Sequence, residues 1–112
     1  MKIVKNLFLV SLLILFAMPL YGAKRLTYYC STDIPWCELM KNEFEKRTGI
    51  RVSMTRASSG ETLTKIRAEK SNPKGDVWWG GTGDPHLQAA EEGLSQAYNS
   101  PKLNELHDWA KA

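Results

Sequence analysis

After residue 24 the hydrophobic pattern of the chain alternates between the period of a strand and the period of a helix. Three short segments are rich in β-branched and aromatic residues or alternate apolar with polar positions, so we predict a strand at each. These segments are Arg25–Cys30, Ile50–Thr55 and Asp76–Trp79. Apolar residues at helical spacing follow each of them. Three strand–helix units in succession predict an α/β fold with a parallel sheet of about three βα units.

The helix after the first strand has the clearest periodicity. Asp33 is a candidate N-cap, and Trp36, Met40 and Phe44 then recur every four residues. We therefore expect the apolar side of the helix to run along these three residues, with Cys37 and Leu39 beside them, and we expect Gly49 to end the helix as a left-handed cap.

The later helices carry recognisable start signals. Ser58 and Glu61 have the spacing of a capping box, while Asp84 followed by Pro85 is expected to supply an N-cap and the first helical position. Gly93 should stop the third helix. The apolar residues expected to turn inward are Leu87, Ala90 and Leu94 for the third helix, and Leu103, Leu106 and Trp109 for a last helix starting at Ser100.

The first 23 residues have the order of a secretory signal peptide. A basic start precedes an apolar run over Leu7–Leu20, and the small residues Gly22 and Ala23 follow, so that cleavage after either one fits. The apolar run is shorter than the roughly 20 residues of an ordinary membrane span. An uncleaved membrane anchor stays open as the alternative. The expected mature part is residues 24–112.

Net charge argues against one class of partner. The whole chain has 15 lysine and arginine residues against 12 acidic ones, and two of the lysines, Lys2 and Lys5, lie in the predicted signal peptide. The exported part is therefore nearly neutral. It lacks the strong positive charge that is typical of a nucleic-acid-binding domain.

Two cysteines, Cys30 and Cys37, lie in the expected exported part. An even count in an oxidising compartment favours a disulfide between them, with free thiols as the alternative. Their spacing is not the Cys-x-x-Cys of a redox enzyme. Together with His86 and His107 they match no zinc motif, so we expect no metal and no cofactor. The chain has no nucleophile elbow, and we predict no catalytic residue and no enzymatic activity.

Small polar or glycine-rich loops follow all three predicted strands. The carboxyl ends of parallel strands are where α/β sheets bind ligands, and the amides and dipoles of helix N-termini there favour a polar or anionic solute. The candidate binding residues are Ser31, Thr32 and Asp33 in the first loop, Ser58, Ser59 and Gly60 in the second, and Gly80, Gly81, Thr82 and Asp84 in the third. Taken singly, Ser58 is explained as an N-cap and the glycines as turn residues. His86 is equally compatible with capping and with ligand contact.

Four segments resemble the N-terminal portion of periplasmic solute-binding proteins of ABC importers, in the ferric-iron-binding branch of the type II group. They are Leu26–Tyr29, Phe44–Val52, Ser58–Glu61 and Asp76–Asp84. The run Trp-Trp-Gly-Gly-Thr-Gly-Asp-Pro-His is the most specific part. The resemblance implies that residues 24–112 are a partial N-terminal lobe of a type II periplasmic-binding-protein fold.

The resemblance also implies a function, namely the substrate-binding component of an ABC transporter. Such a protein captures a small anionic solute in the periplasm and delivers it to permease subunits in the inner membrane. A phosphorylated organic compound and a ferric iron complex are the two candidate solutes. Iron binders of this group carry a histidine and a glutamate where Asp33 and Gly81 stand here, which favours the organic anion.

The same resemblance implies that the second lobe is missing, so we expect a truncated protein with weakened binding. A different class of function stays open beside it. The alternative is a small secreted interaction protein, stabilised by its disulfide and binding no solute.

Overall fold

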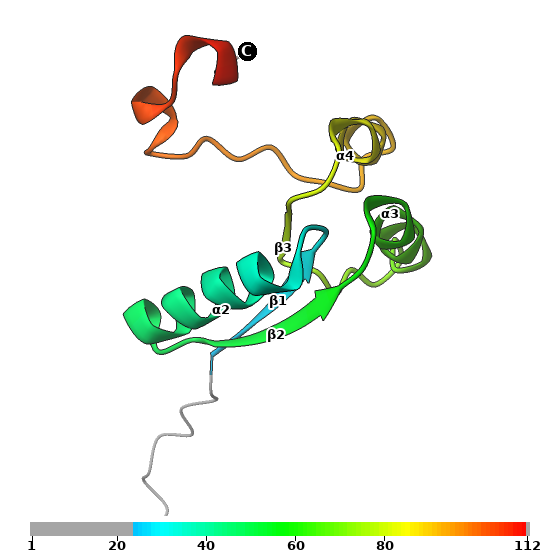
Figure 1. The fold of residues 1–112 in the computed structure, drawn as a ribbon. Helices are drawn as coiled ribbons and strands as arrows, with labels where there is room; N and C mark the ends of the chain where they lie inside the picture. Colours follow the sequence, from blue (N-terminus) through cyan, green and yellow to red (C-terminus); the bar gives the residue numbers. More distant parts are fainter. Residues whose placement is uncertain (1–23, 112) are drawn as a thin grey trace, which may run out of the picture.

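Three parallel strands form the one sheet of the residues that this computed structural model describes, 24–111. They are β1 (Arg25–Cys30), β2 (Arg51–Arg56) and β3 (Val77–Trp79), in the order β2–β1–β3 (Figure 1). The strand positions predicted from the hydrophobic pattern are confirmed, with β2 shifted by one residue and β3 beginning one residue later. The predicted signal peptide lies outside the described residues.

Three helices connect or follow the strands. They are α2 (Ile34–Thr48), α3 (Ser59–Ala68) and α4 (Gly83–Glu91). Figure 1 shows α3 and α4 beside each other and away from α2. An ion pair joins the two, since Arg67 Nε donates to Glu92 Oε2 at 2.8 Å. Within the described part, no helix is both long and apolar enough to cross a membrane.

The two faces of the sheet carry different helices. Successive side chains of a strand point to opposite faces, and on β1 the buried Tyr28 joins the apolar cluster of Cys37 and Val52 on the α2 face. Its neighbour Tyr29 points the other way, where its hydroxyl donates to Glu69 at the end of α3 (2.8 Å). The central strand β1 is therefore covered on both sides, which confirms the predicted α/β class.

The helix ends follow the local signals in the sequence. Gly49 has φ 70° and closes α2 as the predicted left-handed cap. The capping box of Ser58 and Glu61 is present at the start of α3. Gly93 has φ 67° just beyond α4 and stops it. These signals depend on a few neighbouring residues, which explains why they could be recognised without the fold.

The predicted inward face of α2 is wrong at two positions. Trp36 and Met40 are 60% and 48% exposed, whereas Cys37 is fully buried and Phe44 packs against the same cluster. Cys37 and Phe44 are seven residues apart, close to two helical turns, and so lie on one side of the helix. The stripe that faces the sheet is therefore centred on Cys37 and Phe44, and Trp36 lies about a quarter turn away.

The prediction for α4 is wrong both at its start and in its inward face. The N-cap is Thr82 instead of Asp84, and Asp84 lies in the first turn. Leu87 is 65% exposed and Ala90 is also exposed, while Ala89 is buried. The side chain that turns inward is thus a small one, and the larger apolar residue faces solvent.

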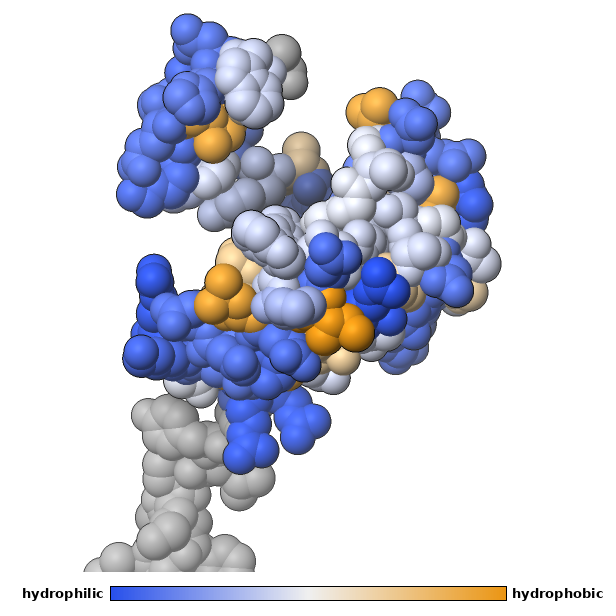
Figure 2. Space-filling model, in the orientation of Figure 1, coloured by the Kyte–Doolittle hydropathy of each residue, from blue (hydrophilic) through white to orange (hydrophobic). Residues whose placement is uncertain are grey.

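The predicted last helix is not formed. Residues 103–105 and 108–110 form two short 3-10 helices, and the apolar side chains expected to pack are exposed. Figure 2 shows this C-terminal segment standing apart from the rest of the molecule. A short amphipathic helix is marginal in water unless its apolar face is buried, and no described surface covers this one.

Candidate functional site

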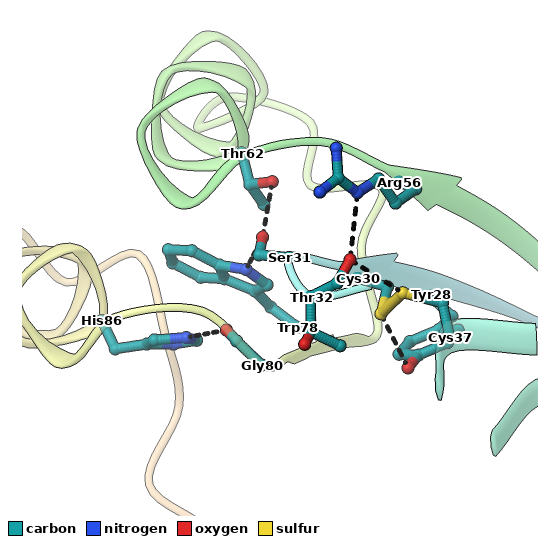
Figure 3. The surroundings of a disulfide bond; sticks show 10 residues. All are labelled: Tyr28, Cys30, Ser31, Thr32, Cys37, Arg56, Thr62, Trp78, Gly80 and His86. Atoms are coloured by element: carbon teal, nitrogen blue, oxygen red, sulfur yellow. Dashed lines mark hydrogen bonds between the residues drawn. A yellow bond between two sulfur atoms is a disulfide. The ribbon is translucent and has the colours of Figure 1, made fainter. Parts of the chain in front are cut away.

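Ser31, directly after β1, connects this strand to β3 and α3 through hydrogen bonds (Figure 3). Its amide donates to the carbonyl of Trp79, which extends the pairing of β1 with β3 by one residue (2.9 Å). Its hydroxyl accepts from Trp78 Nε1 at 2.8 Å and shares a hydrogen bond of 3.1 Å with the hydroxyl of Thr62 in α3. Ser31 is a predicted site residue, and the structure places its hydroxyl in a buried internal network.

The remainder of the β1–α2 loop is more open. Thr32 is half-buried, and its carbonyl accepts from Arg56 Nε at 3.0 Å. Asp33 is exposed at the N-cap of α2 with no side-chain capping hydrogen bond, while its carbonyl accepts from the amide of Cys37 (3.1 Å). The carboxylate of Asp33 therefore faces solvent at the edge of the sheet.

A disulfide constrains the β1–α2 loop at both of its ends. The sulfur atoms of Cys30 and Cys37 are bonded at 2.04 Å, and both residues are fully buried. The bond joins the last residue of β1 to the first turn of α2, so that Ser31–Asp33 is held at both ends (Figure 3). The predicted disulfide is confirmed.

In the β2–α3 loop, Ser58 is engaged in its capping box. Its amide and its hydroxyl both donate to Glu61 Oε2, at 2.9 and 2.7 Å, and the hydroxyl accepts from the Glu61 amide. The hydrogen bonds from Ser58 lower the pKa of the Glu61 carboxyl, because they stabilise its ionised form. The neighbouring Ser59 has its hydroxyl turned to the third loop, where it accepts from the amide of Thr82 (3.1 Å).

The β3–α4 loop passes close to both other loops and depends on glycine to do so. Gly80 and Gly81 have φ 80° and 90°, a region that side chains other than glycine rarely adopt. A Cβ atom on Gly81 would collide with Ser59 Oγ and lie 3.0 Å from Ser31 Cβ. Gly81 is thus the point where the three loops meet, and its place in the fold leaves no room for a side chain.

The side chain of His86, near the start of α4, contacts this loop. Its Nε2 lies 2.9 Å from the carbonyl of Gly80, and its ring stacks on Trp78 with centroids 3.8 Å apart (Figure 3). Trp78 is half-buried here, while Trp79 packs against the apolar cluster on the other face. The two tryptophans therefore lie on opposite faces of the sheet.

The geometry favours binding of an anion at this edge. The amides of Ser59 and Gly60 in α3 and of Gly83 and Asp84 in α4 precede the first hydrogen bond inside their own helices. The N-terminus of each helix also carries about half a unit of positive charge. Among residues 24–111, no group of three histidine, cysteine, aspartate or glutamate side chains is placed to hold a metal ion.

The three loops that were predicted to converge do so, and two further residues lie beside them. Arg56 and Thr62 were not predicted as site residues. Arg56 precedes the second loop at the end of β2, and Thr62 reaches Ser31 from α3. A cation at the carboxyl end of a predicted strand was the available signal for Arg56, whereas Thr62 had no local signal.

Comparison with known proteins places the chain among binding proteins. A family model described as bacterial extracellular solute-binding protein matches residues 26–106. An uncharacterised protein of Haemophilus influenzae is 44% identical over 82 residues, which are 73% of this chain and 24% of that protein.

Solved structures show the same fold. The periplasmic binding protein AfuA of Actinobacillus pleuropneumoniae, with fructose 6-phosphate bound, is 44% identical with a TM-score of 0.74, over 78% of this chain and 27% of AfuA. Iron-bound HitA of Pseudomonas aeruginosa is 23% identical with a TM-score of 0.67, over 74% of this chain and 27% of HitA, a likeness of fold alone. The chain spans about a quarter of the length of these proteins. The predicted resemblance and the type II fold class are confirmed.

Proposed function

The chain belongs to the family of bacterial extracellular solute-binding proteins, and on this basis we propose that it provides one wall of a binding site for a small anionic solute. The observation that carries the proposal is the meeting of three polar loops around Gly81, which lies against Ser59 and Ser31. The amide of Thr82 donates to Ser59 across the same junction. Two helix N-termini beside glycine-rich backbone are a recurring arrangement for binding anions.

A phosphorylated organic compound is the solute class that we propose. AfuA, which is 44% identical to the chain over the matched part, has fructose 6-phosphate bound. A phosphate offers several acceptor oxygens to the amides at the starts of α3 and α4. Ferric iron has less support, because Gly81 contributes no ligand atom and its surroundings leave no room for a carboxylate. HitA binds iron on the same fold, but fold alone does not determine the solute.

We further propose the setting in which such a protein works. AfuA is a periplasmic binding protein, and an apolar N-terminal run like Leu7–Leu20 is typical of an export signal. We therefore place the protein in the periplasm as the substrate-binding component of an ABC transporter, delivering its solute to permease subunits. Its role is to bind and release the solute without changing it chemically.

An NMR titration tests the proposed site. Fructose 6-phosphate is added to the ¹⁵N-labelled chain, and fructose, which lacks the phosphate, serves as the matched neutral control. We expect the amides of Ser59, Gly60 and Gly83 to shift with fructose 6-phosphate only, while Gly49 at the opposite end of the sheet stays in place. Because the described residues supply one wall, we expect weak binding.

Two results would contradict the proposal. Equal shifts with fructose would show that the phosphate is not what the site binds. No shift with either sugar would leave the chain without an anion site and would favour the alternative of a disulfide-stabilised protein that binds no solute.

A further inference from the structure

We propose that Arg56 is the cation with which the site binds the anionic group of its solute; this inference rests on the proposed function. Arg56 is the last residue of β2, and its Cα pairs with that of Cys30 at the end of β1. Its guanidinium therefore lies at the edge of the sheet where the candidate loops begin. None of the three loops contains a lysine or an arginine of its own.

The guanidinium of Arg56 is held at one nitrogen and leaves the other two available. Nε donates to the carbonyl of Thr32 at 3.0 Å, which fixes the side chain against the first loop (Figure 3). Among residues 24–111, neither of the outer nitrogens has a hydrogen-bond partner, and the side chain is exposed. An arginine fixed in this way presents a planar pair of N–H donors, which matches two oxygens of a phosphate or carboxylate.

The charges around the site show why an anion would need this residue. Three carboxylates lie in or beside the loops, on Asp33, Glu61 and Asp84. The pKa of Glu61 is lowered mainly by its hydrogen bonds with Ser58, and the positive charge of the nearby Arg56 contributes in the same direction. Without Arg56, the side chains here would repel a negatively charged solute.

A purely structural role for Arg56 predicts a different behaviour. If the residue only tied β2 to the first loop, its loss would weaken the fold but would not distinguish charged from neutral probes. Arg56→Lys separates the two roles, because lysine keeps the charge but cannot reproduce the planar fork of donors. Arg51→Gln is the matched control, since Arg51 is exposed at the opposite end of the same strand and its loss changes the net charge equally.

The test measures the Kd of fructose 6-phosphate by NMR titration for the wild-type chain and for the variants Arg56→Gln, Arg56→Lys and Arg51→Gln. We expect Arg56→Gln to raise the Kd about tenfold or more, as the loss of a charge-assisted hydrogen bond predicts, and Arg56→Lys to raise it less. Arg51→Gln should leave the Kd within about twofold, because its charge lies beyond the reach of screened interactions. In the wild type, the Arg56 Nε–H signal should shift with fructose 6-phosphate and not with fructose.

The outcomes separate this inference from the proposed function. The role of Arg56 is overturned if Arg56→Gln binds fructose 6-phosphate as tightly as the wild type. It is also overturned if the Arg56 Nε–H signal stays in place while the loop amides shift. Either result leaves the proposed binding site itself uncontradicted. If Arg56→Gln fails to fold, the wild-type Nε–H signal still decides the question. Absence of wild-type binding overturns the proposed function, and the role of Arg56 falls with it.

Discussion

Gly81 lies directly against the hydroxyl of Ser59, so that the third loop of the site has no room for a side chain where it crosses the second. The backbone of Gly81 also has φ 90°, which favours glycine independently of the contact. The residue at position 81 therefore has to meet two conditions. It must adopt a left-handed backbone conformation, and it must stay small.

Replacing this glycine should destabilise the fold. We expect Gly81→Ala to lower the free energy of unfolding by about 1–3 kcal/mol from backbone strain alone, with the collision against Ser59 adding to it. Gly60→Ala is the matched control, because Gly60 lies in the first turn of α3 where an added methyl group would meet open space, and it should be neutral or slightly stabilising. Urea unfolding followed by circular dichroism measures both. Equal stability of the two variants would contradict the packing described for Gly81.

The disulfide should be the main covalent contribution to stability. Cys30 and Cys37 close a short loop, for which the chain-entropy model gives about 2–3 kcal/mol. We expect Cys30→Ala/Cys37→Ala to shift the urea midpoint downward by an amount that corresponds to this energy. Dithiothreitol should lower the wild-type midpoint to a similar degree and leave the double variant unchanged. A wild-type midpoint that ignores the reductant would show that the bond contributes little.

The strands, turns and caps of this fold could be predicted because their signals are local. The bounds of β1 are confirmed residue for residue, and so is the capping box at Ser58. The convergence of the three loops also followed from the general rule that parallel strands end at a common edge. The sequence pattern alone therefore predicted that these loops meet, whereas binding of a ligand there stays a prediction.

The faces of the helices could not be predicted in the same way, because they depend on what each helix packs against. On α4 the inward position belongs to the small Ala89, whereas Leu87 points to solvent. The position of Arg56 depends on the register that aligns it with Cys30, and the hydrogen bond of Ser31 with Thr62 depends on how α3 crosses the sheet. These relationships join residues far apart in the chain, and no periodicity within one segment encodes them.

Stability at high pH should depend on Tyr29. Burial, with the hydrogen bond to Glu69, raises the pKa of Tyr29 to about 12 from an ordinary value of 10.0. Ionisation therefore favours the unfolded chain, so the contribution of the neutral phenol is complete below pH 10 and is lost as the pH rises toward 12. We expect the urea midpoint of Tyr29→Phe to start lower but to fall less than that of the wild type between pH 10 and pH 12. Parallel curves would contradict this assignment.

The buried hydroxyl of Ser31 should matter for stability more than its size suggests. Ser31→Ala leaves Trp78 Nε1 and the hydroxyl of Thr62 without their partner, and an unsatisfied buried polar group costs about 1–3 kcal/mol. Ser53→Ala, at an exposed serine on β2, is the matched control and should change stability by less than about 0.5 kcal/mol. The indole N–H signal of Trp78 should also move in the Ser31 variant alone. If Ser31→Ala is as stable as the wild type and the indole signal does not move, the hydroxyl network does not hold β1, β3 and α3 together.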